Sequence, residues 1–342
     1  MTGAAPPFSH WLAEIASGRT LSETEAAAAF GTMMAGEATP AQMGAFLMGL
    51  RVRGETVAEI TGAARAMRAN ALTIDAPANA IDTCGTGGDA SGSFNISTAA
   101  AFVVAACGVP VAKHGNRKLS SKAGSADVLT ALGVNIDAAP EVVARAIREA
   151  GIGFMMAPKH HAATRHVAAV RAELVTRTIF NLLGPLSNPA GVRRQLLGVF
   201  APQWVKPLAE VLAKLGSESA WVVHGDGMDE LTTTGLNEIA ALESGRIETF
   251  TLDARDLGLA RVRHQDLAGG DSKDNASQML ALFGGAQGPI RDVVSLNVAA
   301  ALKIAGKVPD LAAGLALAGE AIDSGRAQAV LDRLIALTNE AA

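Results

Sequence analysis

The segment at residues 82–98, DTCGTGGDASGSFNIST, constrains the fold of this chain more than any other part of it. A short apolar strand pattern runs into a glycine-rich loop, and a helix pattern starts directly after the loop. The loop contains Gly85, Gly87, Gly88 and Gly92. Glycine lets backbone amides approach an anion closely, and the first turn of a helix offers unpaired N–H groups and the positive end of its dipole. The segment therefore predicts a strand–loop–helix unit that binds phosphate.

Residues 8 to about 70 carry apolar side chains at helical spacing, with no strand pattern between them. Ser22 and Glu25 have the spacing of a capping box. Thr39 followed by Pro40 is typical of an N-cap with proline at the first helical position. We expect a small all-helical N-terminal domain at residues 1–74 and a larger α/β domain at residues 75–342.

From residue 80 onwards, short strand patterns alternate with helix patterns. Strands are expected at residues 81–84, 109–113, 153–156, 196–200, 220–224 and 247–252. Helices are expected at 96–107, 121–132, 140–150, 205–215 and 274–284, and three more near 293–305, 309–323 and 326–340. Such alternation is typical of a mostly parallel central sheet covered by helices.

Composition excludes several classes of protein. The 342 residues are 49% hydrophobic and carry a net charge of −4, which gives no basic field for nucleic acid. The longest nearly apolar run, residues 99–111, is shorter than the ~20 residues of a membrane span, and no signal peptide pattern is present at the start. With two cysteines, Cys84 and Cys107, a disulfide framework is not expected. We expect a soluble, cytoplasmic protein.

A second polar loop, KHGNRKLSSKAGS at residues 113–125, follows an apolar strand pattern. Clustered cations in a loop are often only a solvated surface. However, ligands bind at the carboxyl ends of the strands in open α/β sheets, and both loops are expected there. Arg117 is suited to bind phosphate bidentately, and Lys113 and Lys118 are suited to act as point charges.

The pair Asp229-Glu230 follows the strand pattern AWVVHG. Taken alone, two adjacent acids in a loop are more often exposed surface residues. The functional interpretation is that a divalent cation bridges them to substrate phosphates, and magnesium fits because it keeps several waters and takes one or two carboxylates. We expect this loop to contribute little to the core.

The glycine loop also has rival interpretations. Gly85, Gly87 and Ala90 fit the dinucleotide-binding pattern G-x-G-x-x-G/A, but cations stand where that fold wants an acid for the ribose. A glycine-rich turn without a ligand is the other alternative. The Walker pattern fails because no GK[ST] follows, and no GxSxG elbow supports a serine hydrolase.

The histidines at 160, 161 and 166 do not have the spacing of a zinc site on a helix, so we reject a zinc interpretation. Arg171 and Arg177 lie in an otherwise apolar stretch, RAELVTRTIFNLLGPLSNP. They are either surface cations with buried stems or side chains that bind a substrate carboxylate.

The chain resembles the anthranilate phosphoribosyltransferase family, which joins anthranilate to phosphoribosyl pyrophosphate (PRPP) in tryptophan biosynthesis. The resemblance runs over nearly the whole length and depends on motifs in the right order. They are GEATPAQMGAFLMGLR, GTGGD, NIST, KHGNR, SSKAGSADVLTALG, MMAPKHHAATRHVAAVRAEL, RTIFNLLGPLSNPA and MDELTTTG. One departure is ELVTRTIFN, where the family commonly has a Leu-Gly pair before Arg-Thr-Ile-Phe.

The resemblance implies roles for individual residues. PRPP is expected to contact Gly85, Gly88, Asp89, Ser93, Asn95, Ile96, Ser97, Thr98, Lys113, His114, Gly115, Asn116, Arg117, Lys118, Leu119, Ser120, Ser121 and Ser125. Anthranilate is expected to contact Gly85, Asn116 and Arg171, with Arg171 binding its carboxylate. Ser97, Asp229 and Glu230 are expected to ligate two magnesium ions per subunit. The resemblance also implies a homodimer that pairs through the helical parts, to which the chain returns near residues 166–190.

The expected chemistry fits these residues. Loss of pyrophosphate leaves positive charge on the ribose, so the main demand is electrostatic stabilisation of the leaving group by magnesium, Lys113 and loop amides. Lys113, Asp229 and Glu230 are therefore the expected catalytic residues. Two alternatives stay open: a pyrimidine nucleoside phosphorylase, which does not need the acid pair as a metal site, and a nicotinamide-dependent oxidoreductase.

Overall fold

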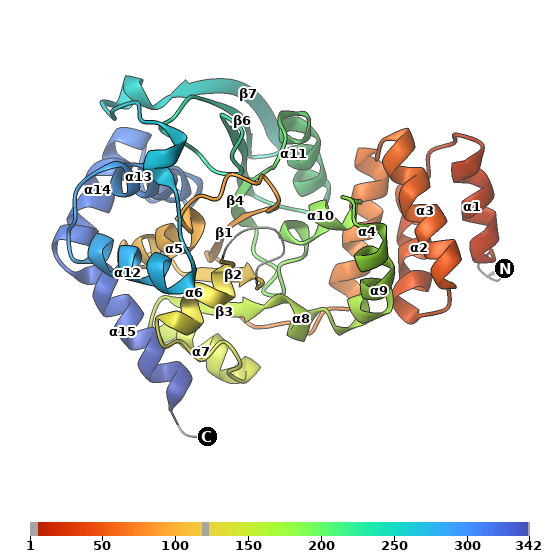
Figure 1. Ribbon diagram of the computed structural model, residues 1–342, viewed down its shortest axis with the longest axis horizontal. Helices are drawn as coiled ribbons and strands as arrows, with labels where there is room; N and C mark the ends of the chain where they lie inside the picture. Colours follow the sequence, from red (N-terminus) through yellow and green to blue (C-terminus); the bar gives the residue numbers. More distant parts are fainter. Residues whose placement is uncertain (1–5, 118–122, 341–342) are drawn as a thin grey trace.

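The computed structural model describes residues 6–117 and 123–340. Four N-terminal helices form a bundle at one end of the molecule (Figure 1). They are α1 (Phe8–Ala16), α2 (Glu23–Ala35), α3 (Pro40–Arg53) and α4 (Val57–Ala69). The capping box that begins α2 is confirmed, since the Glu25 N–H donates to Ser22 Oγ at 3.3 Å and the Ser22 N–H donates to the Glu25 carboxylate at 2.8 Å. Thr39 caps α3 in the same way, with Pro40 in its first turn.

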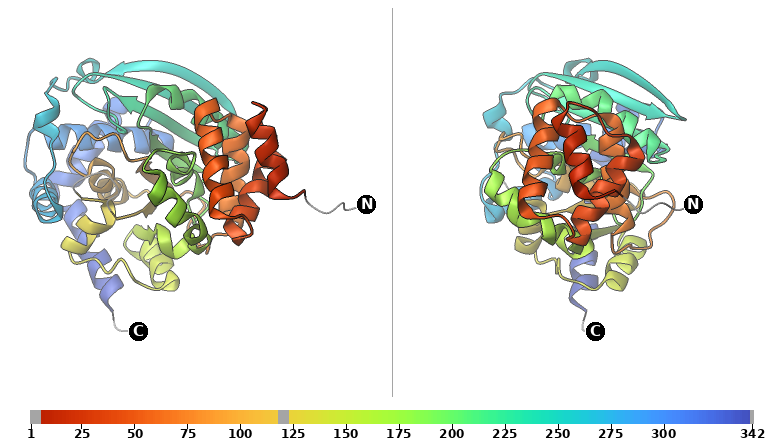
Figure 2. Two further views of the ribbon diagram at one scale, coloured as in Figure 1. Left: turned by 45° about the vertical axis from the view of Figure 1, so that its right-hand side comes forward. Right: turned by 90° about the vertical axis from the view of Figure 1, so that its right-hand side faces the viewer.

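The chain returns to this bundle after the third strand. Three short helices follow that strand: α8 (Ala157–His160), α9 (Arg165–Leu174) and α10 (Phe180–Leu183). Helix α9 packs against α2 and α3, and its Val167 and Val170 are buried in the same apolar cluster as Phe30 and Phe46 of the bundle. Figure 2 shows the bundle from the side and end-on, with α9 against it.

The rest of the chain is built on a sheet that has seven strands among the described residues, in the order β3-β2-β1-β4-β5-β6-β7. The strands are β1 (Ile81–Gly85), β2 (Val111–Gly115), β3 (Ile152–Met156), β4 (Arg194–Gly198), β5 (Ser219–Gly225), β6 (Leu236–Glu243) and β7 (Arg246–Asp253). All pairs from β3 to β5 are parallel, and β6 and β7 are antiparallel additions. The expected α/β fold with a mostly parallel sheet is confirmed.

Strand β6 is the one strand among the described residues that the sequence did not predict. Its sequence, LNEIAALE, contains alanine, leucine and glutamate, which favour helix. Ser244 and Gly245, with φ of 50° and 78°, join β6 to β7, and a two-residue loop with both φ values positive forms a tight hairpin. Pairing with both neighbours therefore overrides the local preference of this segment.

Alternate residues of the strands enter two large apolar clusters on the two faces of the sheet. Leu196 and Val223 face the cluster formed with α5 (Ile96–Ala106), whereas Leu197 and Val222 face the cluster shared with the bundle. The first face is also covered by α6 (Ser125–Ala131), α12 (Ser272–Phe283), α13 (Pro289–Ile304), α14 (Leu311–Asp323) and α15 (Arg326–Asn339). The second is covered by α11 (Val205–Lys214), and α7 (Pro140–Glu149) packs beside β2 and β3. The bundle and the sheet therefore share a continuous core.

Short 3₁₀ helices connect several of these elements: Ala162–Thr164, Pro185–Ser187, Pro202–Trp204, Ala254–Leu257 and His264–Leu267. None of the helices in the described part of the chain is long and apolar enough to cross a membrane.

Helix α9 ends in an unfavourable backbone conformation. Its C-cap, Val175, has φ of 49° and ψ of 27°, and its side chain is 87% exposed. A left-handed conformation costs an L-residue ~1–2 kcal/mol, and a β-branched residue is especially rare there. Since Val175 is so exposed, its side chain gains little from burial in return.

We expect Val175→Gly to increase the free energy of unfolding by ~0.5–1 kcal/mol, after allowance for the greater freedom of glycine in the unfolded chain. Urea denaturation measures this change. Val52→Gly is the matched control, because Val52 is 81% exposed within α3 and has no such conformation to relieve. That control should be destabilising. Equal destabilisation by both variants would show that the backbone at Val175 is not strained.

Candidate active site

Four parallel strands end in glycine at the same edge of the sheet: β1 at Gly85, β2 at Gly115, β4 at Gly198 and β5 at Gly225. The loop after β5 crosses this edge at very short range. A Cβ on Gly198 would lie 1.5 Å from the Asp229 carbonyl oxygen, and a Cβ on Gly85 would lie 2.2 Å from Asp229 Oδ2. The missing side chains therefore make the space that the acid pair occupies.

The glycine loop between β1 and α5 has a backbone conformation that requires its glycines. Gly87, Gly88 and Gly92 have φ of 69°, 78° and 64°, a region that L side chains rarely adopt. The Gly87 N–H donates to Asp229 Oδ2 at 2.6 Å. At the other end of the loop, the Gly269 N–H donates to the Gly92 carbonyl at 2.9 Å. Contacts from two distant parts of the chain thus hold this loop.

Asp229 and Glu230 are both buried, each 9% exposed. The expectation that their loop contributes little to the core is therefore wrong, because the loop packs directly on the strand ends. The Asp229 N–H donates to Asp89 Oδ2 at 3.3 Å, and the Ser97 N–H in the first turn of α5 donates to Glu230 Oε1 at 3.0 Å. Three carboxylates and a helix N-terminus meet here.

Burial raises the pKa of the Asp229 carboxyl well above its usual range, and the charges of Asp89 and Glu230 raise it further. Burial also raises the pKa of Glu230 to about 7, although the charge of Lys113 opposes this rise. Desolvated carboxylates that repel one another bind a divalent cation favourably, so this acid cluster fits magnesium.

Within residues 6–117 and 123–340, no three His, Cys, Asp or Glu side chains are grouped so that they could hold a metal ion by themselves. Magnesium is commonly held by one or two carboxylates together with substrate phosphates and water, so a site for it does not need three such side chains.

Lys113 lies beneath the glycine loop and is only 2% exposed. Its Nζ donates to the Thr83 carbonyl at 2.5 Å and to Ser97 Oγ at 3.4 Å. Next to it on β1, Asp82 has its pKa raised by burial, while the charge of Lys113 and the Asn188 amide, 2.7 Å away, act in the opposite direction. Lys113 thus places a buried positive charge between β1 and the first turn of α5.

Other predicted residues of the first loop make contacts within the fold. Ser93 Oγ accepts from Ser91 Oγ at 3.1 Å, and the Asn95 amide donates to the Ala123 carbonyl at 3.2 Å. Ile96 and Thr98 are buried in the first turn of α5. These residues fix the shape of the loop and of the helix start.

The second loop is only partly described, and Lys118, Leu119, Ser120 and Ser121 lie outside the described residues. Arg117 is exposed and pairs with Asp127 at 3.3 Å. Ser125 Oγ donates to the Asn116 carbonyl at 3.3 Å, which ties the start of α6 to the end of β2.

A cavity of about 210 Å³ opens between this sheet edge and the helices that return to the bundle. Its lining residues are Met67, Cys84, Gly85, Thr86, His114, Gly115, Asn116, Ala157, Pro158, His161, Thr164, Arg171, Phe180, Asn181, Gly184 and Pro185. All three residues predicted to contact anthranilate, Gly85, Asn116 and Arg171, are among them. His114 and Gly115, predicted for PRPP, line the same cavity. The structure thus separates the predicted PRPP residues into a loop group and a cavity group.

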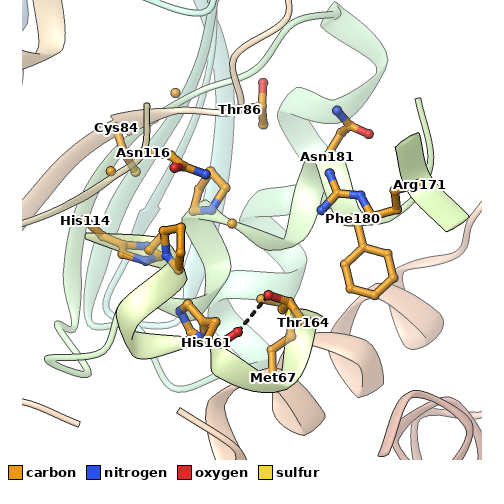
Figure 3. A pocket seen from close by; sticks show the side chains of 16 residues that line it. Met67, Cys84, Thr86, His114, Asn116, His161, Thr164, Arg171, Phe180 and Asn181 are labelled. Carbon is orange, nitrogen blue, oxygen red and sulfur yellow. Dashed lines mark hydrogen bonds between the residues drawn. The ribbon is translucent and has the colours of Figure 1, made fainter. Parts of the chain in front are cut away.

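Arg171 reaches the cavity from the last turn of α9, on the side opposite His114 (Figure 3). Its guanidinium lies over the ring of Phe180, with Cζ 5.1 Å from the ring centroid. Burial lowers the pKa of Arg171 from its usual value, but an arginine stays charged. The side chain therefore brings a fixed positive charge to an otherwise uncharged wall.

His114 and His161 form the opposite wall, with ring centroids 5.1 Å apart. Burial lowers the pKa of His114 to about 3 and that of His161 to about 4, and neighbouring histidines add to both shifts. The Nε2 atoms of both rings are buried and have no hydrogen-bond partner among the described residues. Both rings are therefore neutral near pH 7.

Sequence reasoning from chemistry missed several cavity residues, including Met67, Thr164, Phe180 and Asn181. They come from α4, α9 and the segments around it, and each looks like an ordinary core or loop residue locally. The one available signal was indirect. Thr164, Phe180 and Asn181 lie inside the motifs MMAPKHHAATRHVAAVRAEL and RTIFNLLGPLSNPA on which the family resemblance depends.

Comparison with known proteins agrees with this arrangement. Residues 77–328 match the family model described as "Glycosyl transferase family, a/b domain", and residues 9–71 match "Glycosyl transferase family, helical bundle domain". An anthranilate phosphoribosyltransferase of Rhodopseudomonas palustris is 60% identical over 97% of this chain and 98% of its own.

Two solved structures are closely similar. Anthranilate phosphoribosyltransferase from Thermus thermophilus superimposes with a TM-score of 0.92 at 45% identity, covering 96% of this chain and 99% of that one. The Saccharomyces cerevisiae enzyme in complex with PRPP and Mg gives a TM-score of 0.90 at 26% identity, covering 98% of both chains. On these matches, the chain belongs to the anthranilate phosphoribosyltransferase family.

Proposed function

We propose that this chain transfers the 5-phosphoribosyl group from PRPP to the amine of anthranilate, giving N-(5-phosphoribosyl)anthranilate and pyrophosphate in tryptophan biosynthesis. One observation supports this most. Gly85 and Thr86 begin the glycine loop and also line the cavity that contains Arg171, so a phosphate-binding loop and a carboxylate-binding cavity share one boundary. A donor on the loop can therefore meet an acceptor in the cavity.

The donor side has the features that a diphosphate requires. The left-handed glycines allow the backbone to approach phosphate oxygens, and Ser97 lies in the first turn of α5, where the helix dipole favours negative charge. The remaining predicted PRPP contacts, including Asp89, Ser93, Asn95 and the loop that follows β2, stay part of this proposal.

Asp229, Glu230 and Ser97 are the proposed magnesium ligands, two ions per subunit. Their support is the buried acid cluster, in which burial and the neighbouring acids raise the pKa values, so that a bound cation favours the ionised carboxylates. When bound, magnesium neutralises the charge that develops on the leaving pyrophosphate. Lys113 adds a fixed positive charge behind Ser97.

On the acceptor side, Arg171 is proposed to bind the anthranilate carboxylate, with the Asn116 amide and the neutral imidazoles at the opposite wall. A charge-assisted bond to a carboxylate orients a planar aromatic acid strongly. The amine nitrogen then forms a bond to C1 of the ribose while the C1–oxygen bond breaks and pyrophosphate leaves with the electron pair. The proton of the amine is lost after attack, so no strong general base is required.

We also propose that two copies pair through the helical bundle. Support comes from an apolar depression between α1 and α3, formed by Leu12, Ala13, Ile15, Ala16, Ala45 and Gly49.

We further propose that the protein is cytoplasmic, because both cysteines are free and buried. The domain boundary near residue 74 is also a proposal.

Asp229→Asn with Glu230→Gln should reduce kcat/KM by ~10³-fold or more and abolish its dependence on magnesium, because electrostatic stabilisation of the leaving group is lost. The measurement is loss of anthranilate fluorescence across a magnesium titration. Without metal at pH 8, the variant should unfold at the same or a higher temperature than the wild type, since it no longer buries charged carboxylates.

Asp226→Asn is the control for this double variant, since Asp226 lies in the same loop but pairs with His264 at 3.0 Å. It should keep the wild-type response to magnesium. A double variant with wild-type activity and magnesium dependence would refute the metal assignment.

Arg171→Ala should raise the KM for anthranilate by ~10–100-fold, which corresponds to loss of a charge-assisted hydrogen bond. The KM for PRPP should change far less, because Arg171 lies on the acceptor side of the cavity. Arg165→Ala, an exposed residue at the start of α9, is the control and should leave both values unchanged. Equal increases for the two substrates on Arg171→Ala would indicate a purely structural arginine.

A further inference from the structure

Arg177 lies in the connection after α9 and reaches across to the donor side of the site. Its guanidinium Nη2 donates to the Gly88 carbonyl of the glycine loop. Its Cζ also lies 4.4 Å from the centroid of the Phe200 ring, just beyond the end of β4. Two independent contacts thus place this guanidinium against the loop.

Phe200 is itself fixed to the same loop. Its N–H donates to Thr86 Oγ1 at 3.0 Å, and the Thr86 N–H donates to the Gly198 carbonyl at 2.9 Å. Arg177, Phe200 and Thr86 therefore enclose the first half of the loop from the side of β4.

The contact falls at the point where the loop is most free to change shape. Gly87 and Gly88 both have left-handed φ values, and glycine has more accessible conformations than any other residue. Asp229 holds the Gly87 N–H, and Arg177 holds the carbonyl of the next residue. The peptide groups on the two sides of the Gly87–Gly88 peptide are thus fixed by different partners. Because a trans peptide directs its N–H opposite to its C=O, the contact at the Gly88 carbonyl also turns the Asp89 N–H away from Arg177.

We propose that Arg177 is a positioning residue that holds the glycine loop in the conformation that binds the donor diphosphate. The proposal rests on the function proposed above. Arg177 acts through the Gly88 carbonyl and through Phe200, not by touching the substrate. Without this contact, the donor itself has to order the two glycines when it binds, and its affinity falls accordingly.

The test is steady-state kinetics with each substrate varied in turn. Arg177→Met keeps most of the apolar stem but removes the donor and the charge, so the KM for PRPP should rise by ~5–20-fold. The KM for anthranilate should stay within about 2-fold. Arg177→Lys should restore part of the loss, because an ammonium can still donate to the carbonyl. Melting temperatures should differ little, because Arg177 is exposed.

Phe200→Leu separates positioning from direct binding. If Arg177 acts through its contact with the Phe200 ring, the double variant Arg177→Met with Phe200→Leu should bind PRPP about as weakly as Arg177→Met alone. Additive losses would show that Arg177 contacts the diphosphate itself and would overturn the proposal. An unchanged KM for PRPP in Arg177→Met, or equal increases for both substrates, would overturn it as well.

Arg193→Met is the matched control, since Arg193 is also an exposed arginine that donates to a glycine carbonyl, that of Gly216, away from the site. It should leave both KM values unchanged. Wild-type turnover in the same assay separates a failure of the proposed function from a failure of the proposed role of Arg177. If the wild type is inactive, the proposed function fails. If it is active and Arg177→Met behaves like it, only the role of Arg177 fails.

Discussion

The active-site arrangement depends on the close approach of the Asp229 backbone to the glycines that end β1 and β4. Any side chain at Gly198 would overlap the Asp229 carbonyl, so the loop after β5 can cross the sheet edge only because Cβ atoms are missing there. This approach brings the Asp229 carboxylate to the Gly87 N–H, 142 residues away in sequence. It also removes the acids from water, which raises their pKa and makes a bound cation favourable. The chain geometry and the proposed metal affinity thus have a common origin.

The cavity depends on a different constraint, the return of the chain to the bundle. Met67 comes from α4, Arg171 from α9 and Phe180 from α10. On the sheet side, Gly85 ends β1 and Asn116 directly follows β2. Because the bundle and one face of the sheet share a continuous apolar cluster, these walls are held relative to one another by the core itself. The connection at residues 175–178 links α9 to the glycine loop through Arg177, so the acceptor and donor sides are also joined directly.

The sequence predicted what is local and could not predict what depends on distant packing. The strand–loop–helix unit around the glycines, the helix caps and the parallel strands all follow from short patterns, and the structure confirms them. The burial of Asp229 and Glu230 was missed, because it depends on glycines at the ends of other strands. Strand β6 was missed because its composition favours helix. Arg171 was singled out as a cation in an apolar stretch and received its expected role from the family resemblance, whereas Phe180 gave no such local signal.

The charge of the cavity depends on the burial of the side chains that line it. Among the described residues that line it, Arg171 carries the permanent charge, and the facing imidazoles stay neutral because burial and mutual repulsion oppose their protonation. A second positive charge at His114 or His161 would compete with Arg171 for an anion. With a single cation at one wall and neutral rings at the other, the cavity favours one orientation of a carboxylate, toward the proposed partner Arg171. An aromatic amine is a weak base that is uncharged at neutral pH, so it keeps the lone pair that attack on the ribose requires.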